Sequence, residues 1–148
     1  MEQKRNRPKT QAPQGQSPSS LDLNLLQETS GDCNYSECER LLGQGADVNA
    51  RDEEGCTPLL WAVFAGEKDV VELLLARGAD IRRANNDGET PLHWAVLLRD
   101  HEIAALLLAK GADVNTKDTF GLSPLRSATL NEDQEMVALL RRYGAQGE

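Results

Sequence analysis

The amino-acid sequence predicts an all-α solenoid of four helix-turn-helix units joined by short, β-hairpin-like fingers. Three observations predict this fold. A Thr-Pro-Leu or Ser-Pro-Leu phrase begins at Thr57, Thr90 and Ser123, which lie 33 positions apart. A Gly-Ala pair recurs with the same step, at Gly45, Gly78, Gly111 and Gly144. Apolar residues follow each phrase at helical spacing. A fixed period of this length is typical of stacked supersecondary units.

Each unit contains the local signals for two helices. Thr90 can cap the first free backbone donors of a helix, and Pro91 suits the first helical position because it has no N–H to lose. Apolar residues between Leu92 and Val96 then form one buried face. A second apolar set, from Ile103 to Leu107, predicts another helix, which closes at Lys110 and Gly111. The polar stretch that follows predicts a turn-rich finger.

Equivalent positions in successive units carry similar apolar residues, which predicts the packing between them. Alanine recurs at the helix contacts and leucine fills the layer between units, at Ala62, Ala95 and Ala128, at Leu73, Leu106 and Leu139, and at Leu74, Leu107 and Leu140. No single helix pair can bury its apolar face alone. Stability is therefore expected to come from stacking between nearest neighbours.

The phrase from Thr90 to Ala95 reads Thr-Pro-Leu-His-Trp-Ala, and it resembles the Thr-Pro-Leu-His-x-Ala signature of the ankyrin-repeat family. The resemblance covers about residues 21–148. It implies a protein-binding module, whose finger tips and exposed first helices line a concave groove. It also implies that His93 ties neighbouring loops together by hydrogen bonds.

The period divides the chain into a tail and four units. Residues 1–20 are expected to be a disordered basic tail, 21–51 an N-terminal cap, 52–84 and 85–117 two full repeats, and 118–148 a C-terminal cap. The first unit lacks the Thr-Pro-Leu phrase. Gly31-Asp32 resembles the turn between its two helices, although Gly31 to Gly45 spans 14 positions where Gly66 to Gly78 spans 12. In the last unit Arg141 replaces an outer leucine, as expected of a capping unit.

Charge separates the tail from the rest of the chain. The tail holds four of the 16 basic and one of the 24 acidic residues, so residues 21–148 hold 12 against 23, a net charge of −11. Such a surface is expected to repel phosphate backbones, which argues against nucleic acid as a partner of the folded part. The basic cluster of Lys4, Arg5, Arg7 and Lys9 is either a targeting or nucleic-acid element or a solubilising tail.

No sequence motif indicates catalysis, a cofactor or a metal. The three cysteines, Cys33, Cys38 and Cys56, are expected to be reduced thiols, which favours a cytoplasmic location, with the nucleus as an alternative in a eukaryote. No apolar run approaches the roughly 20 residues of a membrane helix. His101 is expected to face solvent at the start of a second helix. The sequence therefore predicts no enzyme, no cofactor and no membrane association.

Candidate binding residues lie on the fingers and first helices: Arg51, Glu53, Trp61, Arg82, Arg83, Asn85, Trp94, Lys117 and Phe120. The two tryptophans are expected to lie side by side, partly buried and partly presented to a partner. Phe120 is either an exposed anchor or folded back over Leu122 or the cap.

Two further alternatives concern arginines. Arg82 and Arg83 either pair with an acidic partner or balance Glu53, Glu54 and Asp87 within the chain. Arg99 occupies the position of a helix-closing glycine, so either its backbone is strained or the helix ends differently.

These features predict a monomeric, non-catalytic module that binds another protein through the concave groove and the finger tips. The alternative is a structural spacer whose basic N-terminal tail carries the interaction or the targeting. Fold alone does not decide between them.

Overall fold

A computed structural model describes residues 17–147, which contain eight α-helices and no strand. The helices are α1 (Ser20–Ser30), α2 (Tyr35–Gly43), α3 (Pro58–Ala65), α4 (Lys68–Ala76), α5 (Pro91–Leu97), α6 (His101–Ala109), α7 (Pro124–Leu130) and α8 (Gln134–Arg142). They form four pairs, α1–α2, α3–α4, α5–α6 and α7–α8, which we call units 1 to 4. The predicted all-α repeat fold is confirmed.

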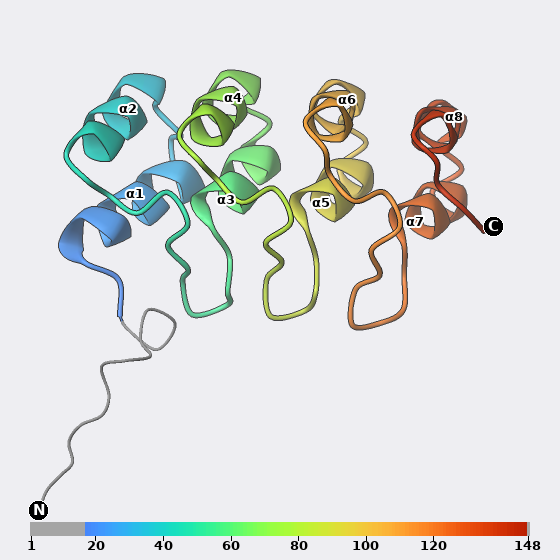
Figure 1. The fold of residues 1–148 in the computed structure, drawn as a ribbon, viewed down its shortest axis with the longest axis horizontal. Coiled ribbons are helices and arrows are strands. Elements are labelled where there is room, and N and C mark those ends of the chain that lie inside the picture. Colours follow the sequence, from blue (N-terminus) through green and yellow to red (C-terminus); the bar gives the residue numbers. More distant parts are fainter. Residues whose placement is uncertain (1–16, 148) are drawn as a thin grey trace, which may run out of the picture.

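The helices form two rows, with α1, α3, α5 and α7 in one and α2, α4, α6 and α8 in the other (Figure 1). Within each row every helix packs against its neighbours along the array. Three fingers, between α2 and α3, α4 and α5, and α6 and α7, project from the first row in the same direction (Figure 1). The fingers therefore lie beside the first row of helices, on the side away from the second row (Figure 1).

The core is the layer of small and branched apolar residues predicted from the repeat. Ala62, Ala95 and Ala128 are fully buried, as are Leu74, Leu107 and Leu140. The outer leucines are less enclosed, since Leu106 and Leu139 are only partly buried. Small side chains at the first-helix contacts let α3, α5 and α7 approach closely, so each unit buries its apolar face against its neighbours.

Each finger is organised by one side chain at its base: Asp52, Asn85 or Asp118. In the third finger, Asp118 Oδ1 accepts hydrogen bonds from the backbone N–H groups of Phe120 and Leu122, each 2.9 Å long. Asp52 and Asn85 accept the equivalent pairs at 2.9–3.0 Å. These Asx turns satisfy donors that a strand partner would otherwise satisfy, so the fingers form without a sheet.

Neighbouring fingers are also bonded to each other. The Asn86 N–H donates to Glu54 O at 2.9 Å, and the Thr119 N–H donates to Asp87 O at 3.0 Å. Gly55 and Gly88 permit this approach, because a Cβ at Gly88 would lie 2.9 Å from Thr119 N. The fingers therefore form one continuous edge of the molecule.

Each first helix is followed within three residues by a left-handed residue, and this residue recurs every 33 positions, at Cys33, Gly66, Arg99 and Glu132, with φ between 54° and 74°. Gly31 and Asp32 form the turn between α1 and α2, as predicted, but Gly31 has φ −107° and the left-handed backbone is at Cys33. Cys33 to Gly45 spans the regular 12 positions. For Arg99, the strained alternative is correct, with φ 60°.

Helix α1 starts within the range assigned to the tail. The Asp22 N–H donates to Ser19 Oγ, and the Ser19 N–H donates to Asp22 Oδ2, so the two residues form a capping box. This cap places the first helical residue at Ser20. The predicted basic cluster, Lys4 to Lys9, lies outside the described residues.

Candidate protein-binding surface

Three aromatic side chains gather on the first helices of units 2 and 3. The ring centroids of Trp61 and Trp94 are 5.6 Å apart in an edge-to-face arrangement, and Phe64 lies 5.8 Å from each tryptophan. Both tryptophans are half-buried, while the side chain of Phe64 is 57% exposed. Edge-to-face contacts of this kind stabilise an aromatic cluster beyond simple area burial. The tryptophans thus lie side by side as predicted, and Phe64 extends their cluster into solvent.

The indole N–H groups are already bonded within the chain. Trp61 Nε1 donates to Asp52 Oδ2, and Trp94 Nε1 donates to Glu89 Oε1, both at 2.9 Å. These bonds fix the orientation of each ring against the base of its own finger. A partner would therefore meet the apolar rings, not an unsatisfied N–H donor.

A row of exposed apolar side chains continues from Phe64 along the array. Leu97 and Leu130 occupy the positions of Phe64 in units 3 and 4, and they are 49% and 59% exposed. We call Phe64, Leu97 and Leu130 the apolar row. Together with Trp61, Trp94 and Leu98, which is 45% exposed, it forms what we call the first-helix face.

Sequence reasoning did not identify the apolar row, although the signal was present. Phe64, Leu97 and Leu130 are 33 positions apart, like the Thr-Pro-Leu phrases. The buried residues recur with the same 33-residue step. Periodicity alone therefore could not show whether Phe64, Leu97 and Leu130 face the core or the solvent. Exposure in the folded array is what distinguishes this row from the core.

Two open depressions lie where the fingers meet the first helices. One, of about 900 Å³, is lined by Leu23 and Trp61 together with the tip of the first finger, from Arg51 to Gly55. The other, of about 410 Å³, adjoins Trp94 and carries four carboxylates and no basic side chain, namely Glu53, Glu54, Asp87 and Glu89. Acidic groups therefore border the tryptophans on the finger side.

Phe120 is presented at the tip of the third finger. Its side chain is 73% exposed, which selects the exposed alternative over packing on Leu122. It occupies the position held by Glu54 and Asp87 in the other two fingers. An aromatic ring at this degree of exposure is a candidate anchor for a partner.

The two arginines of the second finger, Arg82 and Arg83, differ in their interactions within the chain. Arg83 pairs with Asp80, with 3.5 Å between Nε and Oδ2, and the charge of Arg82 helps to lower the pKa of Asp113, after the hydrogen bonds from Asn115 and Thr116. The intramolecular alternative therefore holds for Arg83, but its partner is Asp80 and not the predicted Glu53, Glu54 or Asp87.

The other predicted site residues differ in how much they offer a partner. Arg51 Nη2 donates to Ala84 O at 3.3 Å, which joins the first two fingers. Asn85 is half-buried and holds its own finger, since its amide also donates to Glu89 Oε1. Glu53 and Lys117 are exposed. Arg51 and Asn85 thus shape the surface, while Glu53 and Lys117 are presented on it.

His93 has the structural role that the resemblance implied. It is 2% exposed, and its Nδ1 lies 3.1 Å from the Thr90 backbone nitrogen and 2.9 Å from Thr90 Oγ1. Its Nε2 lies 3.1 Å from Leu122 O in the next finger. Because Nδ1 accepts from the Thr90 N–H, Nε2 carries the proton and donates to the Leu122 carbonyl. His93 therefore links two units.

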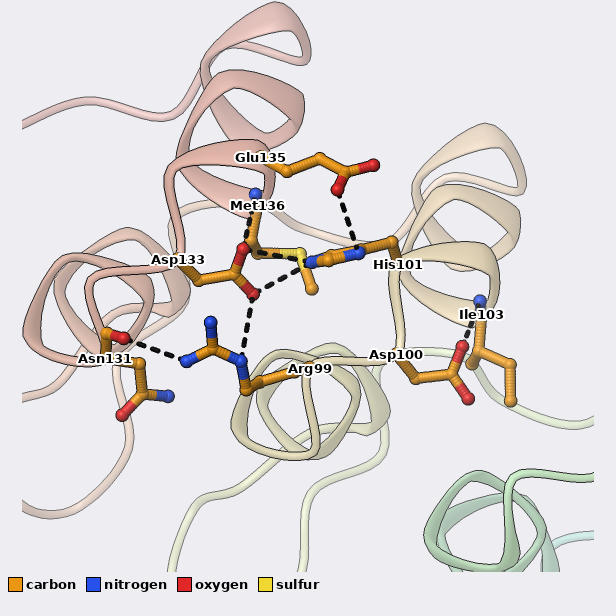
Figure 2. A network of polar contacts seen from close by, with 8 residues as sticks. All are labelled: Arg99, Asp100, His101, Ile103, Asn131, Asp133, Glu135 and Met136. Carbon is orange, nitrogen blue, oxygen red and sulfur yellow. Dashed lines mark hydrogen bonds and ion pairs between the residues drawn. The ribbon is translucent and has the colours of Figure 1, made fainter.

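His101 does not simply face solvent, which corrects the prediction. It is one-third exposed, and its Nε2 donates to Asp133, with distances of 3.0 and 2.9 Å to the two carboxylate oxygens (Figure 2). Its Nδ1 lies 3.4 Å from Glu135 Oε1. Arg99 completes the cluster, with Nε 3.9 Å from Asp133 Oδ2. This network joins units 3 and 4 on the side of the second helices.

Asp133 is the buried centre of that network. Burial by itself would raise its pKa, but the hydrogen bonds from His101 and the Met136 N–H, with the charges of His101 and Arg99, outweigh burial, so the pKa of Asp133 is lowered. The same carboxylate caps α8 through the Met136 N–H at 3.1 Å. The cluster therefore links unit 3 to unit 4 through polar contacts.

The three cysteines are free and buried. Burial, with smaller contributions from neighbouring carboxylates, raises the pKa of Cys33 and Cys56 to about 11 and, helped by Cys33, that of Cys38 to about 12. Thiols in this state are protonated at neutral pH and are poor nucleophiles. None of them is placed for covalent chemistry.

Within residues 17–147 no three metal-ligating side chains gather into a cluster. Of the eight helices described, none combines the length and apolar character needed to cross a bilayer.

The fold and this surface define a class: a helical repeat array with an exposed face and fingers, of the kind that binds proteins. Residues 26–118 match the family described as ankyrin repeats in three copies, so the chain belongs to the ankyrin-repeat family. Unit 4, outside the matched range, has the same helix pair. Domains of this family are usually non-catalytic, and no enzyme family is found. A search of curated proteins found no match.

Proposed function

We propose that this chain is a non-catalytic module that binds a partner protein across the first-helix face and the finger tips. Ankyrin repeats typically serve protein–protein interaction, which supports the general role. The particular surface is our assignment. It includes Trp61, Trp94 and Phe120, with Glu53 and Lys117 presented beside them and Arg51, Arg82, Arg83 and Asn85 shaping the fingers.

The observation that carries this proposal is the apolar row. Three large apolar side chains at one equivalent position are each about half exposed and do not belong to the buried core of the array. Exposed apolar patches on a soluble domain mark interaction sites. Because the row adjoins the aromatic cluster, a partner could bury a continuous apolar strip there.

The absence of catalysis in this proposal rests on the chemistry of the described side chains. His93 and His101 are both bonded to neighbouring units, and the cysteine thiols are buried with raised pKa values. We further propose that the module acts as a monomer, needs no cofactor and does not bind nucleic acid through residues 21–148, where net charge is −11. A cytoplasmic location, or a nuclear one in a eukaryote, remains part of the same proposal.

The second candidate is a spacer whose interaction is carried by residues 1–20. It is favoured by the basic cluster from Lys4 to Lys9. Deleting residues 1–18 separates the two functions while keeping Ser19, which caps α1. The surface model predicts that partner binding is kept, and the spacer model predicts that it is lost.

The decisive experiment is a comparative pull-down with the full chain and a Leu97→Ser, Leu130→Ser, Phe120→Ser variant. All three side chains are about half exposed or more, so the variant is expected to fold, which circular dichroism can check. A matched control is Tyr35→Ser with Tyr143→Ser, 43% and 44% exposed and outside the first helices. A partner lost only by the first variant supports the proposal. A partner retained by both variants contradicts it.

A further inference from the structure

We propose that the partner segment is an amphipathic α-helix that lays its apolar stripe on the first-helix face and carries lysine or arginine on the flank toward the fingers. This inference rests on the proposed function and names the chemistry of the partner.

The repeat spacing favours a helix. Packed helices lie roughly 8–10 Å apart, so neighbouring members of the apolar row are separated by about that distance. In an α-helix, residues seven positions apart lie on one face and about 10.5 Å apart. In an extended strand, residues on one face lie about 6.7 or 13.4 Å apart, and neither spacing matches. A helix can therefore contact Phe64, Leu97 and Leu130 with every second turn.

The width of the surface points the same way. The first-helix face is two side chains wide over units 2 and 3, because Phe64 contacts both Trp61 and Trp94. An amphipathic helix presents an apolar stripe about 100° wide and can cover two columns. A polyproline II segment repeats every three residues, about 9.3 Å, but presents a single line of side chains. It is the competing occupant in the test below.

Charge fixes the orientation of the partner. The depression beside Trp94 carries four carboxylates and no basic side chain, and the one beside Trp61 carries Asp52, Glu53 and Glu54 against Arg51. Basic side chains on the finger flank of the helix would enter these depressions. They would also lie near the indole rings, where cations are attracted to the aromatic faces.

The chain contains a direct reporter of this event. Its only two tryptophans, Trp61 and Trp94, both belong to the first-helix face. Their fluorescence, measured on the full chain, responds to occupancy of the face. The probe is an 18-residue peptide with leucines on one helical face and lysines along one flank.

The peptide is expected to give a saturable fluorescence change that weakens as salt is raised. The Leu97→Ser, Leu130→Ser variant should bind at least tenfold more weakly, while the Tyr35→Ser, Tyr143→Ser control should bind like the native chain. A peptide with glutamate in place of lysine should not bind. These results together would establish the proposed partner chemistry.

Four outcomes would overturn the inference. The first two are equal binding of a scrambled peptide without the apolar stripe and tighter binding of a basic proline-rich peptide. The third is self-association of the chain through the apolar row, seen as a molecular mass that rises with concentration. The fourth is peptide binding that appears only after residues 1–16 are removed. The last two would assign the row to a second copy or to the chain's own N-terminal segment. If the peptide fails but the Leu97→Ser, Leu130→Ser, Phe120→Ser variant still loses its partner in the pull-down, the inference fails and the proposed function stands.

Discussion

Replacing Gly88 by alanine tests whether contact between fingers stabilises the array. Gly88 has φ 76°, a conformation that costs an L-residue about 1–2 kcal/mol. Its new Cβ would lie 2.9 Å from Thr119 N and 3.2 Å from Asp118 Cα, so the third finger must move away. That movement weakens two hydrogen bonds to Asp87 O, from Thr119 N and Thr119 Oγ1, each contributing about 1 kcal/mol. The expected loss is about 3–4 kcal/mol.

Gly121 provides the matched control. It occupies the same place in the third finger with φ 82°, but a Cβ there has no other atom within 4 Å. Gly121→Ala therefore carries only the backbone cost, about 1–2 kcal/mol. Urea unfolding followed by circular dichroism should show a difference of about 2 kcal/mol between the variants, with unchanged m-values. Equal losses would show that the finger contacts contribute nothing to stability.

Three further predictions follow from the repeat positions. Glu132→Gly should raise the free energy of unfolding by about 0.5 kcal/mol. Glu132 has φ 57°, and glycine relieves this backbone strain, although it also loses more conformational entropy on folding. Any destabilisation in thermal denaturation would contradict the prediction. Arg82→Asn should raise the free energy of unfolding by about 1 kcal/mol. The reason is that Asn49, at the equivalent position, forms hydrogen bonds with Gly78 O and the Asp80 N–H of the next unit. An unchanged midpoint of unfolding in urea would refute this prediction. The lowered pKa of Asp133 means that its contribution is complete above pH 3.8, the ordinary value, and is lost as pH falls through the lower folded value. Asp133→Asn should therefore show a weaker loss of stability below about pH 4 than the native chain, and parallel pH curves would rule this out.

The repeat fold was readable from the sequence because its determinants are local and periodic. Thr57, Thr90 and Ser123 each cap a first helix with the hydroxyl expected of them, and a proline follows each cap. The alanine and leucine positions recur every 33 residues, so the direction of the core could be inferred without coordinates.

The candidate surface was only partly predictable. The pairing of Trp61 and Trp94 followed from their equivalence in neighbouring units, and the structure confirms it. Phe64 and Leu97 were missed because the sequence of a short helix does not show which of its apolar residues face the core and which face the solvent. The 33-residue step could have grouped them, but only burial separates an exposed row from a buried one.

The sequence by itself determined the number of units, their helices and the family, because capping, turn chemistry and apolar periodicity act between residues close in the chain. The tertiary structure alone decided which groups meet across units. It brought His101 to Asp133, 32 positions away, and it placed the left-handed residue of the first unit at Cys33. Such contacts depend on how neighbouring units stack, and stacking energy is shared among many residues.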